Sequence, residues 1–477
     1  MKSSITKNIA YNSIYEILII ILPIFTSPYI SRVLGPELLG TYSYTASIAY
    51  YFQMFAMLGI KFYGNRSIAK NRDNPSKLNL VFSEILVVHI LVSLLVVVAY
   101  GIYCIYLSEN RLYAAIQGMQ VLAALFDVSW LFFGLEKFKL TVTRNVIIKL
   151  LTVLSIFCFV KEENDFWIYL AIMAGSQLAS QIMLMCMASK YVHFIKPYFK
   201  NVIKHIKPLL ILFLPVLALG IFKYTDKIML GMFGMQQELG YYENAERIIN
   251  IPLSIVFSFG TVMLPRISNM VQNDDSKQVE RYMGLSIKFM GGLSLAMAAG
   301  LIGIAKVFAP VFWGEEFVMS GVLIQILAFS LPASTLANIM RNQDMIPHGK
   351  DKEYAISVLA GAVVNIVLNL LLIQKYKSVG VSIATVCAEF AVFFVQWLYT
   401  RKSHKYFTYI RRMWPFLLSS CAMAGMVIFI GSEAAYTVTA LLALIALGII
   451  TFSILMLILS IMTKDELFDV IKHRWRK

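Results

Sequence analysis

The 477-residue sequence contains little cysteine and little charge. Its five cysteines share no CxxC spacing and fall inside apolar runs, so they indicate packing residues rather than disulfides or a metal site. Only 14% of the residues are charged, against about a quarter in a soluble domain. The sequence also lacks a GxxxxGKS/T nucleotide loop, an HExxH motif, a DxD motif and a nucleophile elbow. We therefore expect no cofactor and no enzyme activity.

Apolar residues make up 59% of the sequence and are concentrated in long runs. Each run can cross about 30 Å of hydrocarbon as a helix, and none alternates as a barrel strand would. The sequence predicts an all-α polytopic membrane protein with about fourteen transmembrane helices. The runs lie at residues 8–32, 40–61, 79–104, 112–134, 140–160, 166–189, 207–232, 243–265, 284–309, 318–340, 354–374, 378–400, 413–431 and 436–462.

Lysine and arginine are unevenly distributed among the connections between these runs. About 28 lie at the two termini and in alternate connections, whereas only about four lie in the others, at Arg111, Lys161, Lys375 and Lys377. Because positively charged loops remain in the cytoplasm, both termini are expected there. The net charge of +15 is thus an orientation signal, and no nucleic-acid partner is expected.

The longest cytoplasmic connections follow the sixth and twelfth runs, which suggests six helices, six more, and two extra. We predict an N-terminal six-helix lobe at 1–189, a cytoplasmic linker at 190–207, a C-terminal six-helix lobe at 208–400, and two extra helices with a basic tail at 401–477. The spacing from Gly40 to Arg66 recurs from Gly240 to Arg266. This weak match favours two parallel repeats with the transported molecule bound between them.

Cations inside or at the ends of the predicted helices are functional candidates, because a charge in hydrocarbon costs several kcal/mol unless it faces a cavity. They are Arg32, Lys61, Lys223, Lys227 and Arg247, in the first, second, seventh and eighth helices. Parallel repeats would bring these helices together, so we predict a cationic cavity that binds phosphate.

An alternative is that these charges pair locally. In that case Lys223 pairs with Asp226, which lies on the same helix face three residues later. Likewise Arg247 pairs with Glu243, while the other cations only reach the membrane surface. The sequence alone leaves both interpretations open.

Acidic residues in the predicted helices are candidates for ion or proton coupling, because burial raises a carboxyl pKa towards the working pH. They are Glu16, Asp127, Asp226 and Glu389. Glu84 also lies in a predicted helix, but His89, just over one turn away, gives it a structural alternative. Pro23 and Pro28 are expected to break the first helix.

Several motifs resemble those of one protein family. The segment SRVLGPELLGTY at residues 31–42 resembles the first-hairpin signature of polysaccharide-precursor flippases. These form the Wzx-type branch of the multidrug/oligosaccharidyl-lipid/polysaccharide exporter superfamily. Further matches, in the order expected, are GIK and GNR at 59–61 and 64–66, DKIMLG at 226–231, LGYY at 239–242, LPRIS at 264–268 and IPHGK at 346–350.

The resemblance implies a MATE-like fold in the inner membrane of a bacterial cell. It also implies that an undecaprenyl-diphosphate-linked oligosaccharide crosses from the cytoplasmic to the outer leaflet by alternating access, driven by an ion gradient. The product would supply capsule, O-antigen or exopolysaccharide, with a polysaccharide polymerase and a chain-length regulator as partners. Arg32, Lys61, Lys227 and Arg247 would then lie near the cavity.

Other functions remain possible from the sequence. A peptidoglycan-precursor flippase or an ion-coupled drug exporter belongs to the same superfamily, although an exporter of organic cations should have an acidic cavity. A membrane polysaccharide polymerase comes from another class. Short predicted outer loops argue against it.

Overall fold

The computed structural model describes residues 2–463, with side chains from residue 22 onward. Its contacts define two compact units, Met1–Leu239 and Gly240–Lys477. Residues 2–463 contain helices, turns and loops and no strand, so the predicted all-α class is confirmed. The predicted coupling residue Glu16 lies outside the described side chains.

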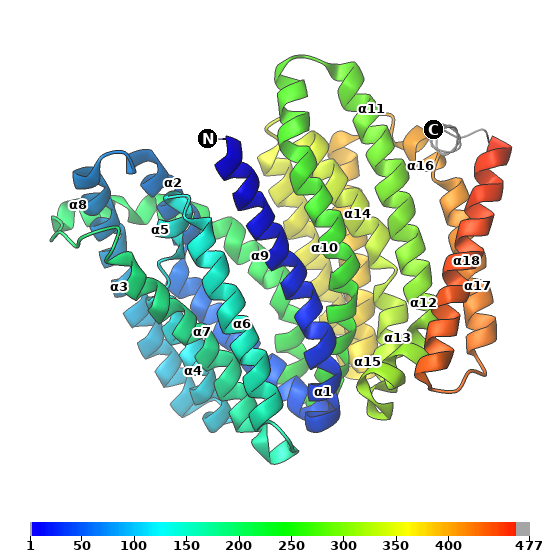
Figure 1. Cartoon of the computed structure of the whole chain (residues 1–477), viewed down its shortest axis with the longest axis horizontal. Coiled ribbons are helices and arrows are strands. Elements are labelled where there is room, and N and C mark those ends of the chain that lie inside the picture. The colour runs from blue at the N-terminus through cyan, green and yellow to red at the C-terminus, as the bar shows by residue number, and fades with distance from the viewer. Residues whose placement is uncertain (1, 464–477) are drawn as a thin grey trace. The chain divides into compact units, whose positions relative to one another are not determined.

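The first unit contains the helices of the N-terminal half of the chain (Figure 1). They are α1 (Lys2–Met57), α2 (Ile60–Asn71), α3 (Pro75–Ile102), α4 (Arg111–Leu125), α5 (Ser129–Gly134), α6 (Phe138–Phe159), α7 (Phe166–Ala188), α8 (Phe199–Lys204) and α9 (Ile206–Met232). The first unit thus includes α9, which the sequence assigned to the second lobe. The four-part division and the parallel repeats stay predictions.

The second unit begins within α10 (Gln236–Gln272). The helices that follow are α11 (Ser276–Ser286), α12 (Gly292–Trp313), α13 (Val318–Leu327), α14 (Ser330–Met340), α15 (Asp351–Thr400), α16 (Tyr406–Arg411), α17 (Trp414–Gly431) and α18 (Val438–Thr463). Single π-helical turns continue α3, α11 and α14, at Tyr103–Leu107, Ile287–Gly291 and Arg341–Met345.

Two long helices each contain a break at one residue. In α1 it is Gly35, at φ 67° and ψ 175°, and in α15 it is Lys377, at φ 48° and ψ −129°. A Cβ built on Gly380 would lie 2.8 Å from the carbonyl oxygen of Leu372, so the two arms of α15 turn back against each other. Each of these helices therefore supplies two crossings.

The described helices account for the predicted number of crossings. Ten helices within residues 2–463 are long and apolar enough to span a membrane, and the pair Glu315–Leu327 and Ser330–Met345, bent by 45°, makes an eleventh. The second arm of α15 adds one more, and the two arms of α1 add two. The chain is thus a multi-pass membrane protein with about fourteen crossings, as predicted.

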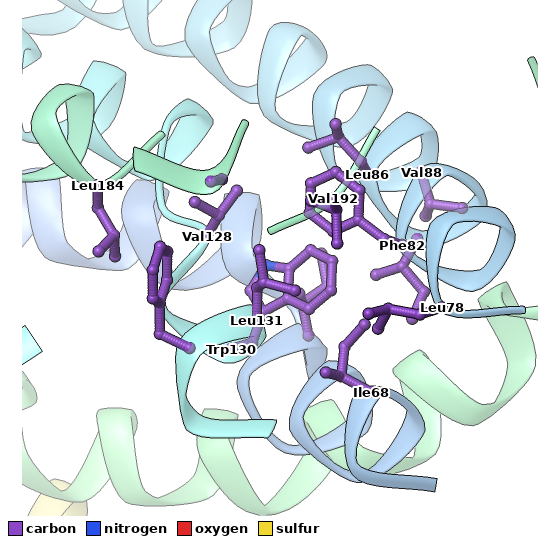
Figure 2. Close-up of a cluster of buried hydrophobic side chains, with 14 of the residues drawn as sticks. Ile68, Leu78, Phe82, Leu86, Val88, Val128, Trp130, Leu131, Leu184 and Val192 are labelled. Atoms are coloured by element: carbon purple, nitrogen blue, oxygen red, sulfur yellow. The ribbon is translucent and has the colours of Figure 1, made fainter. Parts of the chain in front are cut away.

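A buried core in the first unit holds the short helix α5 in place. Figure 2 shows Trp130 of α5 in a cluster with Ile68 of α2 and Phe82 of α3. The indole stacks on the Phe82 ring, with 5.4 Å between centroids. Gly64 on α2 makes this approach possible, because a Cβ there would lie 2.6 Å from the indole. The core thereby fixes the position of Ser129, which lines the polar cavity described in the next section.

Candidate substrate site

A polar cavity of about 410 Å³ lies inside the first unit. Helices α1, α2, α4, α5, α6 and α7 line it, so elements far apart in the sequence form it together. Most of its lining is polar, in a chain that is 59% apolar. The polar residues are Lys61, Gln117, Gln120, Asp127, Ser129, Arg144, Asn145, Lys149, Thr152, Ser176, Gln177, Ser180 and Gln181.

Arg144 is anchored between two walls of this cavity. It lies on α6, is only 5% exposed, and donates from Nη1 to the carbonyl oxygen of Ser180 on α7 at 3.1 Å. Nη1 also lies 3.3 Å from the amide oxygen of Gln181, and Nη2 donates to Asn145 Oδ1 at 2.6 Å. These three acceptors are neutral groups that orient the guanidinium.

The charged lining of the cavity is predominantly positive. It comprises Lys61 from α2, Arg144 and Lys149 from α6, and Asp127 from the loop before α5. Asp127 Oδ1 accepts a hydrogen bond from the Ser129 backbone N–H at 2.9 Å, so one carboxylate oxygen stabilises the start of α5. Three cations against one carboxylate favour an anionic ligand, and a fixed guanidinium suits phosphate.

The side-chain nitrogen of one amide that lines the cavity is unsatisfied among residues 22–463. Gln117 on α4 is 1% exposed, and its side-chain nitrogen has no hydrogen-bond acceptor among the described residues. A buried donor left unsatisfied costs about 1–3 kcal/mol, so an oxygen that reaches this nitrogen would stabilise the group. Gln120, nearly one turn later, donates to Gln53 on α1 at 3.2 Å. Side-chain amides of this kind pair well with the hydroxyl groups of sugars.

A second basic cluster lies on α9 of the same unit. The Nζ atoms of Lys223 and Lys227 lie 5.6 and 5.8 Å from the centre of the Tyr224 ring. That ring stacks on Tyr50 of α1, with 4.1 Å between centroids. Lys227 and its neighbour Asp226 are buried, whereas Lys223 is exposed. The predicted shared face of α9 thus contains one buried and one exposed cation beside one aromatic ring.

The remaining predicted residues lie in separate places. Arg32 is exposed on α1. Arg247, on α10 in the second unit, donates from Nη2 to Glu243 Oε1 at 3.3 Å, which is the local pairing considered as the alternative. Glu389 on α15 accepts a hydrogen bond from the Ser334 hydroxyl at 2.7 Å. Lys61 and Asp127 are the two predicted site residues that the cavity brings together, and a common cavity for all five cations stays a prediction.

Sequence reasoning missed Arg144, Lys149 and Gln117. Both cations lie within the predicted helix 140–160, where the rule applied to the other helices would have marked them as candidates. Glu84, for which the sequence offered a structural role, has its carboxylate 3.0 Å from Nε2 of His205, a histidine far away in the sequence.

The second unit buries a carboxylate at the end of α14. Asp344 is fully buried; Lys350 Nζ and His348 Nδ1 each lie 3.1 Å from its Oδ1, and the Tyr406 hydroxyl donates to its Oδ2 at 3.2 Å. His404 Nε2 lies 3.8 Å away. Burial lowers the pKa of His404, and Asp344 opposes that shift. These groups connect the segment after α15 to the end of α14.

Fold and site together define a polytopic helical membrane protein with a polar cavity whose charged lining is mostly cationic. The chain matches a solved structure titled lipid II flippase MurJ, inward closed conformation, with a TM-score of 0.76 and 17% identity, covering 96% of this chain and 100% of that one. It also matches an inward-facing multidrug resistance MATE family transporter of the MOP superfamily, with a TM-score of 0.60 and 12% identity, covering 80% and 98%. The predicted MATE-like fold is confirmed.

The family follows from the sequence comparison. The profile of the family described as "Polysaccharide biosynthesis protein" matches residues 5–271, more than half of the 477 residues, so the chain belongs to that family. A "Putative O-antigen transporter" of Shigella dysenteriae is 24% identical over 372 residues, which cover 77% of this chain and 92% of that protein. The predicted resemblance is confirmed at the level of the family.

Proposed function

We propose that this protein is a flippase that moves an undecaprenyl-diphosphate-linked oligosaccharide from the cytoplasmic to the outer leaflet of a bacterial inner membrane by alternating access. Family membership supports a role in polysaccharide biosynthesis, and the Shigella relative named for O-antigen transport supports a glycan cargo. The concentration of Lys and Arg at both termini and in alternate connections supports a cytoplasmic position for the two termini. The product would serve capsule, O-antigen or exopolysaccharide assembly.

The observation that carries the proposal is the cationic, amide-rich cavity of the first unit. A diphosphate would meet Lys61, Arg144 and Lys149, of which Arg144 is already oriented by neutral acceptors. Sugar hydroxyls would pair with amides such as that of Gln117, whose nitrogen lacks an acceptor within the described chain. The polyprenyl tail is apolar and would remain in the bilayer.

Ion coupling is part of the proposal. Asp127 shares the cavity with three cations, so an arriving diphosphate would compete with its carboxylate for them. Binding of the substrate and binding of a proton or ion at Asp127 would thereby be linked. Asp226, Glu389 and Glu16 are further candidates, and Arg32, Lys223, Lys227 and Arg247 are proposed to line the path of the diphosphate.

A peptidoglycan-precursor flippase is the second candidate, because the fold matches that of a lipid II flippase over 96% of this chain. An exporter of organic cations is disfavoured, because the cavity carries three cations against one carboxylate. We expect no catalytic step in the chain. A polysaccharide polymerase and a chain-length regulator are proposed as partners in the membrane.

Reconstitution into vesicles tests the proposal. A fluorescent undecaprenyl-diphosphate oligosaccharide is incorporated, and an impermeant quencher reports how fast labelled lipid reaches the outer leaflet. Wild-type protein should accelerate flipping over protein-free vesicles, and Arg144→Gln should reduce the rate about tenfold or more. Lys190→Gln, at an exposed position in the linker, should match wild type.

Two outcomes would contradict the proposed transport of the oligosaccharide lipid. Wild-type vesicles that flip no faster than protein-free ones would remove the flippase assignment. Flipping of a labelled peptidoglycan precursor, with none of the oligosaccharide lipid, would select the second candidate.

A further inference from the structure

The second unit contains a basic pocket of about 770 Å³ that the proposed flipping mechanism does not use. It lies among α11, the π-turn Ile287–Gly291, α16, α17 and the end of α18. The charged residues in its lining are Lys277, Arg281, Lys288, Arg412 and Glu280. Four cations against one carboxylate give the pocket a strong preference for anions.

Part of the wall of this pocket is buried and tightly packed. Lys288 is buried, with Nζ 5.4 Å from the Phe289 ring. A Cβ on Gly284 would lie 3.2 Å from the Tyr409 ring, which shows how closely α11 packs against α16. The other cations, Lys277, Arg281 and Arg412, are exposed and can adjust to a ligand. One buried cation with three exposed and adjustable cations around it suits a phosphate group.

The pocket lies at the boundary of the membrane. Trp414, the first residue of α17, and Thr463, the last residue of α18, both line it, and each begins or ends a candidate membrane span. Tryptophan is typical of this depth. Next to these residues, Leu418 is 53% and Met462 is 74% exposed, so an apolar surface continues from the pocket along α17 and α18.

We propose that this pocket binds the headgroup phosphate of an anionic phospholipid of the cytoplasmic leaflet, whose acyl chains lie along α17 and α18. Basic pockets between helices on the cytoplasmic side bind such headgroups, and the orientation proposed above places the pocket there. The chain beyond Thr463 is a poor competitor, because residues 464–477 carry five Lys and Arg against three Asp and Glu. The bound lipid would bridge α11 and the cytoplasmic ends of the last two helices.

Native mass spectrometry of the delipidated full-length protein provides the test. Phosphatidylglycerol and phosphatidylcholine with the same acyl chains are titrated in parallel. Wild type should bind phosphatidylglycerol more tightly. Arg281→Gln combined with Arg412→Gln should weaken phosphatidylglycerol binding about 25-fold, at about fivefold per charge, and leave phosphatidylcholine binding unchanged.

Two matched variants complete the experiment. Lys352→Gln with Lys402→Gln removes two exposed cations outside the pocket and should bind phosphatidylglycerol as wild type does. Arg281→Lys with Arg412→Lys keeps both charges and should retain most of the affinity, which separates loss of charge from misfolding.

Equal phosphatidylglycerol affinity of the Arg281→Gln, Arg412→Gln variant and of the Lys352→Gln, Lys402→Gln control would overturn the proposal. So would equal affinity of wild type for the two lipids, or displacement of the lipid by millimolar glycerol phosphate alone, which would indicate a site for free anions. Binding of only the diphosphate-linked substrate lipid would reassign the pocket to the transport path. None of these results depends on whether the protein flips that substrate.

Discussion

His205 and Glu84, 121 residues apart in the sequence, lie with Nε2 and Oε2 3.0 Å apart. His205 stands at the junction of α8 and α9, and Glu84 is on α3. The other ring nitrogen of His205 lies 2.7 Å from the Tyr63 hydroxyl on α2. Two helices, α2 and α3, thus hold the end of the 190–207 linker through the His205 side chain, and both members of the pair are largely buried.

Glu84→Ala and His205→Ala should each loosen the linker. Removal of one partner leaves a buried polar group unsatisfied, at about 1–3 kcal/mol, so protease cleavage within residues 190–204 should accelerate. Limited proteolysis in detergent measures this, with the exposed His193→Ala as control. Unchanged cleavage in both variants would mean that packing alone holds the segment.

Lys227→Ala and Arg247→Ala should impair translocation while the protein remains in the membrane. Lys227 is buried beside Tyr224, and Arg247 bonds to Glu243, so each loss removes a cation held in a defined position. We expect each variant to reduce flipping about tenfold, measured in vesicles against membrane protein level. Full activity in both variants and in their combination would exclude a cationic transport path through these residues.

Gly64→Ala should destabilise the first unit. The added Cβ would lie 2.6 Å from the fully buried indole of Trp130, and overpacking of this kind costs about 1–3 kcal/mol. Gly101→Ala is the matched control, because a Cβ on that helical glycine meets no atom within 4 Å. The thermal midpoint in detergent should fall for the first variant only, and equal midpoints would show that the core can adjust.

Stability should depend on pH through His404. Burial lowers its pKa, with His348 and Lys350 acting in the same direction and Asp344 and Glu280 opposing. Below the ordinary histidine pKa of about 6.5 the unfolded chain binds more protons than the native one, so stability should fall as the pH falls. His404→Gln should flatten the thermal midpoint between about pH 5 and 7, whereas the exposed His193→Gln should not. A wild-type slope retained in His404→Gln would assign the pH dependence to another group.

The crossings were predictable because length and apolarity suffice to define them, but the position of a break within one helix was not. Pro23 and Pro28 were expected to interrupt the first helix, and this expectation is wrong, since the chain stays helical through both. The break falls at Gly35, where the positive φ suits a residue without Cβ and Pro36 disfavours a continuing helix. A proline inside a membrane helix is tolerated when neighbouring helices satisfy the freed carbonyl.

The cavity was harder to predict, because its properties depend on contacts between distant residues. The sequence indicates that Arg144 is a cation in an apolar run, but not that oxygens of Ser180 and Gln181, on the next helix, would orient it. Nor does it show that the Gln117 nitrogen would find no acceptor in the part of the chain that the structure describes. Charge within a helix can be read from sequence, whereas the partners that determine its role require the fold.

The single-residue turn at Lys377 also bears on how the protein is made. Its arms meet closely at Gly380 and Leu372, with no loop between them. The connection that must cross the bilayer after the first arm has entered it is short, although it carries two cations, Lys375 and Lys377. The two arms should therefore leave the translocon as a preformed hairpin, so a charge introduced into either arm would impair the membrane insertion of both.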